Sequence, residues 1–189
     1  MKFNLSILAS FVLVLCMTTI TAQKKGKRGK STSSEILKMT FEKLQEDESV
    51  TELGAISILD NGVSSPTENA ADLFQNGAGK EFGVPNNVFG SEMTSETGGS
   101  VYAGFVAYRP GRESSLRSYI TIPFLKGKGN ISLSKGLQYC VQFDVSLAES
   151  SKFACNNIGA YLTKEAPTTP SGIINASENL IRGKPVSYT

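Results

Sequence analysis

The sequence contains no histidine among its 189 residues. This absence removes the commonest general base and a leading zinc ligand. The sequence also lacks a G-x-S-x-G nucleophile elbow, a phosphate-binding P-loop and a Cys-x-x-C pair. The two cysteines that follow the N-terminal apolar run cannot close a zinc site by themselves. The sequence therefore gives no support for the commonest classes of catalytic or zinc-binding protein.

No apolar run reaches the roughly 20 residues that a membrane-spanning helix needs. The longest run extends from Leu5 to Met17, after a charged start at Lys2, and small and polar residues follow it up to Ala22. We interpret residues 1–22 as a secretory signal peptide that is cleaved after Ala22, with a buried N-terminal helix as the alternative. Export to the periplasm, outer membrane or cell surface is therefore predicted, with no transmembrane span after cleavage.

The positive charge of the chain is concentrated in the run KKGKRGK, which begins at Lys24. Without this run and Lys2, residues 31–189 hold 13 basic and 17 acidic residues. Such a balance does not favour nucleic-acid binding by the folded part. We interpret residues 23–34 as a basic flexible linker, although its charges could also contact phosphates or anionic lipid. Residues 35–189 form the predicted folded module.

Short apolar runs separated by Gly, Pro, Asn and Ser predict a series of strands. The predicted strands cover residues 54–59, 100–108, 118–125, 136–147 and 156–163. Because no convincing helix lies between them, we expect an all-β fold, an antiparallel β-sandwich. The segment 62–99 lacks a regular pattern, and long irregular segments often carry binding function or pack as structured loops. Residues 35–44 fit a helical spacing slightly better than a strand alternation.

The clearest strand is 137–147, where apolar and polar residues alternate strictly. One face is predicted to cover the core, and the polar face carries Cys140. If 137–147 and 157–163 form a hairpin, Cys155 lies just past the turn, whereas Cys140 lies about 23 Å down the first strand. A disulfide needs Cα atoms within about 7 Å, so a Cys140–Cys155 bond is not expected.

Polar and aromatic residues near the irregular segment are the candidates for ligand binding. Amide and carboxylate groups can hydrogen-bond hydroxyls, and exposed tyrosines can stack on sugars. Alternatively, the asparagines cap turns and the tyrosines complete the core. The Asp60-Asn61-Gly62 tripeptide is interpreted as a turn, although its oxygens could also bind calcium; no metal, cofactor or catalytic residue is predicted. The candidate binding residues are Asp72, Asn86, Asn87, Tyr102, Tyr108 and Arg109.

Four stretches occur in an order that resembles a known family: SSPTENAADLF (64–74), GVPNNVFGSE (83–92), YAGFVAY (102–108) and YCVQFDVSLAESSKFACNNIGAYL (139–162). Together they resemble the N-terminal β-sandwich module of outer-membrane-protein-A family (peptidoglycan-associating) proteins from Gram-negative envelopes.

This resemblance implies a jelly-roll fold similar to galactose-binding domains, which we expect to be incomplete at the C-terminus, and no known catalytic residues. It also implies that residues 35–44 form a strand, because Thr40-Phe41-Glu42-Lys43 matches the end of the family's opening extended segment. Val63 departs from the family, which often has tryptophan there, and the peptidoglycan-binding C-terminal domain is not in this sequence. We therefore expect a fragment of a longer protein, or a shortened relative that is not anchored to the cell wall.

The expected function is a non-enzymatic, exported cell-envelope module with a structural or adhesive role. It would be the N-terminal part of an outer-membrane-protein-A-type protein, with a glycan or an envelope protein as its partner. The alternative is a stand-alone carbohydrate-binding module at the cell surface. A hydrolase is the third hypothesis.

Overall fold

The computed structural model describes residues 12–25, 31–93, 99–107, 117–126, 129–134, 137–154, 158–163, 165–168 and 180–182. These residues form strands and one short 3-10 helix, η1 (Ala55–Ile58). The predicted all-β class is confirmed, and the ladders between the named strands are antiparallel. The strands are β1 (Val12–Lys25), β2 (Ser31–Thr40), β3 (Asp72–Gln75), β4 (Asn86–Asn87), β5 (Gly90–Ser91), β6 (Val101–Val106), β7 (Leu125–Lys126), β8 (Gly129–Asn130), β9 (Gln138–Leu147), β10 (Gly159–Tyr161) and β11 (Leu180–Arg182).

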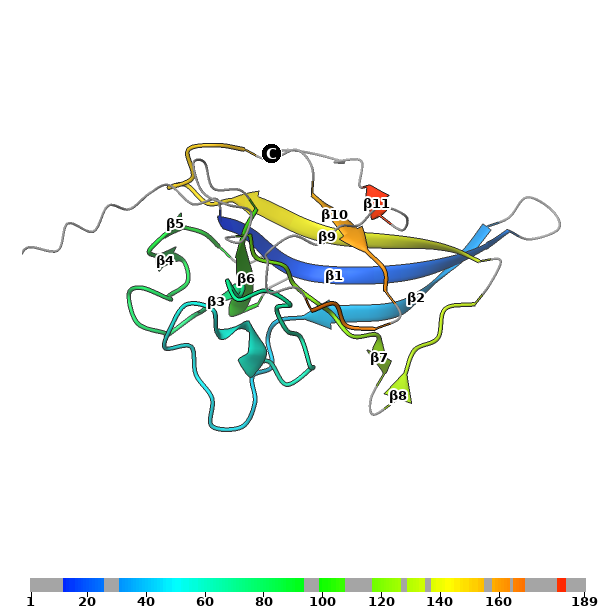
Figure 1. The fold of residues 1–189 in the computed structure, drawn as a ribbon, viewed down its shortest axis with the longest axis horizontal. Coiled ribbons are helices and arrows are strands. Elements are labelled where there is room, and N and C mark those ends of the chain that lie inside the picture. Colours follow the sequence, from blue (N-terminus) through cyan, green and yellow to red (C-terminus); the bar gives the residue numbers. More distant parts are fainter. Residues whose placement is uncertain are drawn as a thin grey trace, which may run out of the picture.

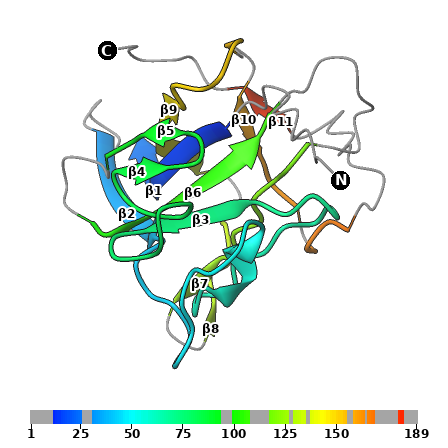
Figure 2. The same cartoon turned by 90° about the vertical axis from the view of Figure 1, so that its left-hand side faces the viewer.

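The main sheet has five strands, in the order β2-β1-β6-β3 with β9 also paired to β1. The long strands β2, β1 and β9 run side by side (Figure 1), and β3 pairs with β6 beyond them (Figure 2). Three two-stranded sheets, β4-β5, β7-β8 and β10-β11, complete the pairing among the described residues.

Strand β1 includes residues 12–22 of the predicted signal peptide. In the full chain these residues pair with three other strands. The predicted linker 23–34 is also partly paired, because Gln23–Lys25 lie opposite Ser31–Ser33 at the ends of β1 and β2, and Ser34 lies opposite Ala22. Residues 26–30 between them lie outside the described residues.

The ladder between β3 and β6 separates two groups of buried side chains. Leu73, Val101 and Ala103 belong to the larger cluster, which also includes residues of β2, η1 and the loops. Phe74 and Tyr102 form the smaller cluster with Ala148. Because successive strand residues point to opposite faces, this short ladder contributes to the core on both of its faces.

Residues 54–59 do not form the predicted strand, and this expectation is wrong. Ala55–Ile58 is a 3-10 helix that begins after Gly54, whose φ of 81° lies in the left-handed region that suits glycine. Ile56 and Leu59 are buried three positions apart, which is the period of a 3-10 helix. A short apolar run cannot distinguish this arrangement from a strand.

The predicted strand 118–125 is wrong for residues 118–124, which form no ladder; their one β-bridge joins Thr121 to Ser64, and Leu125 begins β7. The hairpin considered between 137–147 and 157–163 is not formed by the described residues. Strand β9 pairs with β1, and β10 pairs with β11. Alternation identifies a strand but does not specify its partner.

Other expectations are confirmed in full or in part. The strand that the resemblance implied over residues 35–44 is confirmed for 35–40, which belong to β2, and is wrong for 41–44, where the only β-contact is the bridge between Leu44 and Leu59. Residues 101–106 and 138–147 are strands β6 and β9, and Asp60-Asn61-Gly62 forms a turn in which Gly62 has a φ of 72°. The apolar face of β9 is less covered than expected, because Val145 and Leu147 are 40% and 39% exposed.

Candidate functional site

Four of the six predicted binding residues lie within the described part of the chain. Asp72 is in β3, Asn86 and Asn87 form β4, and Tyr102 is in β6. Tyr108 and Arg109 lie outside the described residues. The four described residues therefore belong to the β3–β6 ladder and to the loop that follows β3.

Tyr102 is a core residue in this structure. Its side chain is 1% exposed, and its ring centroid lies 5.0 Å from that of Phe74. Phe74 also meets Phe89 edge to face, with ring centroids 5.9 Å apart. Such aromatic contacts stabilise a core beyond the burial of apolar area. In this conformation Tyr102 has no exposed ring face on which a sugar could stack.

Asn87 connects this aromatic cluster to the loop. Its Nδ2 donates to the Tyr102 hydroxyl at 2.6 Å, and its Oδ1 accepts the Phe89 N–H at 2.9 Å. A side-chain oxygen that accepts a backbone N–H two residues later is typical of asparagine in turns. The amide of Asn87 therefore positions Phe89 and Tyr102, while neighbouring Asn86 is exposed.

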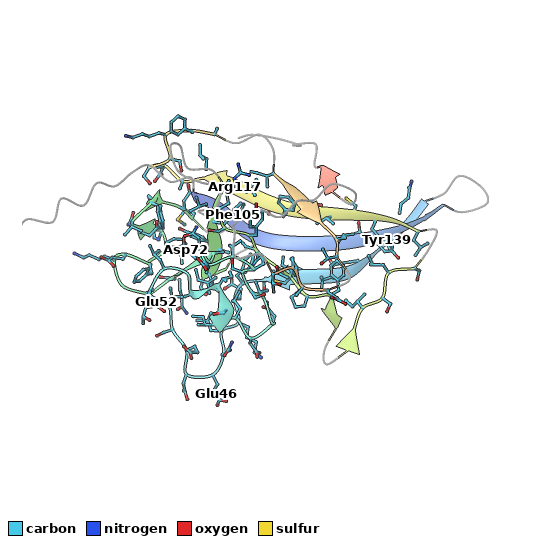
Figure 3. All side chains as sticks on the ribbon, in the orientation of Figure 1. Glu46, Glu52, Asp72, Phe105, Arg117 and Tyr139 are labelled. Atoms are coloured by element: carbon cyan, nitrogen blue, oxygen red, sulfur yellow. The ribbon has the colours of Figure 1, made fainter. Side chains whose placement is uncertain are left out.

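Asp72 is the buried acidic group of the ladder. Its side chain is 7% exposed, and its Oδ1 accepts the N–H of Gly54 at 2.7 Å. Burial raises the pKa of Asp72 from 3.8 to about 6, although the hydrogen bond from Gly54 opposes this increase. The carboxyl joins β3 to the residue that precedes η1, and Figure 3 shows it among the loops around β3 and β6.

A surface depression of about 390 Å³ lies where the chain turns after β3. Backbone hydrogen bonds hold this turn: the Gln75 N–H donates to the Phe82 carbonyl at 2.9 Å, and the Phe82 N–H donates to the Gly79 carbonyl at 3.0 Å. The peptide bond between Val84 and Pro85 is cis. Two of the lining residues, Lys80 and Asn86, have polar side chains, and both residues are exposed. The lining residues are Gly77, Ala78, Gly79, Lys80, Gly83, Val84, Pro85 and Asn86.

Sequence reasoning missed two carboxylates that lie between the loop and β9. The Glu92 Oε2 accepts the Ser146 hydroxyl at 3.0 Å, and the Glu149 Oε2 accepts the Ser91 N–H. Burial raises the pKa of Glu92; the hydrogen bond from Ser146 lowers it, and the charge of Glu149 raises it further. The two residues are 57 positions apart in the sequence, so no local pattern could have revealed this pair.

Residues of the SSPTENA stretch fasten one loop to another. The Ser65 hydroxyl donates to the Tyr119 carbonyl at 2.7 Å, and the Asn69 Nδ2 donates to the Ser118 Oγ at 2.8 Å. Thr67 donates to the carbonyl of Asn69 at 3.0 Å. Residues 118–124 have no β-ladder, and side-chain hydrogen bonds from Ser65 and Asn69 connect residues 118 and 119 to this stretch. The polar residues of this stretch therefore hold two loops together.

Asn61 and Asp60 also make contacts within the protein. The Asn61 Nδ2 donates to the Thr40 carbonyl at 3.1 Å, its Oδ1 accepts the Val63 N–H at 3.3 Å, and Asp60 pairs with Lys43. Across the described residues, no three acidic or cysteine side chains lie together in a group that could hold a metal ion. Cys140 is exposed on β9 with a free thiol, whereas Cys155 lies outside the described residues.

No protein-family model, curated protein or solved structure matches this chain. The resemblance to the outer-membrane-protein-A family therefore stays a prediction. Within the described residues, no helix has the length and apolar character needed to cross a bilayer.

Proposed function

We propose that this chain is a non-enzymatic, exported module of the cell envelope with a structural or adhesive role. The proposal rests on one observation: polar side chains of the stretches 64–74 and 83–92 form hydrogen bonds that hold the loops in place. Ser65 and Asn69 hold the 64–70 loop on residues 118–119, and Asn87 holds the 86–89 turn on Tyr102. Loops that are fixed by such side-chain hydrogen bonds form a rigid surface, and a rigid surface is suited to binding a partner.

The presented surface includes the loop from the end of β3 to Met93. Its exposed side chains are both polar and apolar, as in Lys80, Asn86, Val88 and Met93. Protein and glycan partners are recognised by surfaces that combine these two kinds of contact. We place the adhesive contact on this loop surface, in an outer-membrane-protein-A-type protein of the envelope.

Export can be tested with the full chain carrying a C-terminal tag in a Gram-negative host. We expect the tagged protein in the envelope fraction with Gln23 as its first residue. The control is the same chain without residues 2–22, which should stay in the cytoplasm. A full chain that stays in the cytoplasm with Met1 intact would contradict the proposal.

The place of the module in a longer protein is tested by sequencing the gene beyond codon 189. A wall-binding domain in the same reading frame is expected. A stop codon directly after Thr189 would contradict this part of the proposal and leave export unaffected.

The depression beside Lys80 and Asn86 favours a second candidate, a stand-alone carbohydrate-binding module. Lysine and asparagine side chains can donate several hydrogen bonds to sugar hydroxyls. On a glycan array, we expect Lys80→Ala and Asn86→Ala to lose binding and Lys43→Ala, an exposed lysine outside the depression, to keep it. Equal binding by all three variants would exclude the depression as the site. Turnover of a chromogenic glycoside would instead indicate a hydrolase.

A further inference from the structure

Strand β1 is paired along both of its edges. Leu13–Leu15 lies between β6 and β9, and Thr18–Gln23 lies between β2 and β9. Figure 1 shows β1 between β2 and β9. Among the described residues, β1 is the only strand that pairs with β2 and the only one that pairs with β9. The long half of the sheet therefore depends on β1.

Removal of the predicted signal peptide would take away most of this strand. Cleavage after Ala22 leaves only Gln23–Lys25 of β1. The strands β2 and β9 are both antiparallel to β1, so they are parallel to each other and about 10 Å apart, which is two strand spacings. Their backbone N–H and C=O groups that face β1 would lose their partners, and unpaired backbone groups of this kind are a template for strand addition.

We propose that the exported module binds an extended segment of another protein in the slot that β1 would leave, with β9 on one side and β2 and β6 on the other. This inference rests on the proposed export and cleavage. The bound segment is an antiparallel strand of about ten residues, because β1 pairs with β9 from Leu13 to Gln23. Recognition by strand addition combines main-chain hydrogen bonds with contacts of alternate side chains.

The side chains of β9 define the chemistry of this segment. Tyr139, Val141 and Phe143 are half-buried, whereas Gln138, Cys140 and other residues of the opposite face are exposed. A residue placed opposite Tyr139, Val141 or Phe143 lies on the same face as its partner. The segment therefore needs apolar side chains at alternate positions.

The chain itself offers no suitable occupant among its described strands. Outside the main sheet, the described strands are two or three residues long, and the slot is about ten residues long. After Leu162, the sequence contains no ten-residue stretch in which apolar residues alternate. This is why we assign the slot to a separate protein.

The first test uses the protein exported from the host, with Gln23 as its first residue, and a synthetic peptide of residues 12–22, the part of β1 that cleavage would remove. We expect the peptide to raise the melting temperature by about 5–10 °C when its concentration is about 100 times its dissociation constant. If the exported chain is unfolded alone, the peptide should induce its β-sheet signal in circular dichroism. Amide hydrogen exchange should slow in β2 and β9.

The matched control peptide carries Thr19→Pro. In the sheet, Thr19 is paired with Lys38 on one edge and Gln142 on the other. Proline has no N–H to donate and is not accommodated in the middle of a central strand. The control peptide should therefore produce no shift in melting temperature.

The second test uses Cys140 to report the register of the bound peptide. Thr21 lies opposite Cys140, and directly opposed residues of an antiparallel pair have Cα atoms about 5 Å apart, within disulfide range. With Cys155→Ser protein and oxidised glutathione as oxidant, a peptide carrying Cys16→Ser and Thr21→Cys should form a disulfide with Cys140. A peptide carrying Cys16→Ser and Thr19→Cys should react at least about ten times more slowly, because its thiol is two residues away.

The outcomes separate this inference from the proposed function. An exported chain that begins at Gln23 but shows neither the peptide effect nor the register preference would overturn the inference and leave the proposed function intact. If β2 paired directly with β9 after cleavage, the slot would be closed and this result would be observed. A chain that keeps Met1 and stays in the cytoplasm would overturn both.

Discussion

The strands β6 and β9 both pair with β1, but their side chains lie in different surroundings. In β6, residues 101–104 are all buried, and both faces of the strand contact a core cluster. In β9, the apolar face is half-buried at residues 139–143 and exposed at Val145 and Leu147, while the polar face is exposed throughout. In Figure 3, Asp72 and Phe105 lie near β6, and Tyr139 lies at the far end of the long strands.

This difference shows that similar backbone pairing can rest on different stabilising interactions. The region around β3 and β6 is held by close packing and by side-chain hydrogen bonds such as that from Asn87 to Tyr102. The long strands are joined by the ladders that β1 forms with β2 and β9, and most described side chains of β9 are exposed. Substitutions that remove side-chain contacts should therefore cost more in the first region than in the second.

The largest effect is expected for Phe74→Ala. Phe74 is fully buried, and truncating a buried phenylalanine costs about 3–5 kcal/mol because it leaves a cavity. The matched control is Phe153→Ala, since Phe153 is 46% exposed and should cost clearly less. Phe153 lies in the loop after β9. Urea unfolding of both variants measures the difference, and equal losses would contradict close packing around Phe74.

The second effect is a pH dependence that comes from Asp72. Because its pKa is raised from 3.8 to about 6 in the folded chain, the folded state holds the proton more tightly than the unfolded state. The resulting stability is fully present below pH 3.8 and is lost as the pH rises through 6, a change of about 3 kcal/mol.

Asp72→Asn isolates this contribution. An amide oxygen can still accept the N–H of Gly54 but does not ionise. The variant should therefore be more stable than the parent at pH 7 and should lack the parent's fall in stability between pH 4 and 6, as measured by urea unfolding at each pH. The same fall in both proteins would assign it to other groups.

A smaller effect is expected for Tyr102→Phe, which removes one hydroxyl from the core. Asn87 would lose its 2.6 Å hydrogen bond to that hydroxyl, at a cost of about 1 kcal/mol or more. Tyr139→Phe is the matched control on β9, where an exposed hydroxyl accepts the Ser134 N–H at 2.6 Å. Water can replace this exposed partner, so its thermal unfolding midpoint should shift less. A larger shift in the unfolding midpoint for Tyr139→Phe than for Tyr102→Phe would contradict the expectation that side-chain contacts contribute more around β6 than on β9.

The sequence predicted β9 more easily than β3, for a physical reason. β9 has ten residues, and one of its faces is more exposed to solvent than the other. Polar and apolar residues therefore alternate along this strand. β3 has only four residues, Asp72–Gln75, of which the first three are buried. A strand that is buried on both faces shows no alternation, and its partner β6 lies about 30 residues further along the chain. The sequence pattern therefore could not reveal β3.

The candidate site was predicted less well than the fold. Asp72, Asn87 and Tyr102 were recognised as chemically suited to binding, but residue type does not report burial. The contact of Asp72 with Gly54 and the contact of Asn87 with Tyr102 depend on which loops and strands lie next to each other in the fold. Asn86 and the neighbouring Lys80 line the depression, whose existence depends on the backbone of the turn after β3. For Tyr102, the structure agrees with the alternative interpretation, in which the tyrosines complete the core.

The smallest effect is expected for Val145→Thr on β9. Threonine has nearly the shape of valine but adds a hydroxyl, which is costly only where water cannot reach it. Val145 is 40% exposed, so its change in unfolding free energy should stay within about 0.5 kcal/mol. Val101→Thr is the matched substitution on β6, where the side chain is buried and a loss of about 1–3 kcal/mol is expected for an unpaired hydroxyl. Equal losses in urea unfolding would mean that the apolar face of β9 is covered at Val145 in solution, as it would be if copies of the chain associated through it.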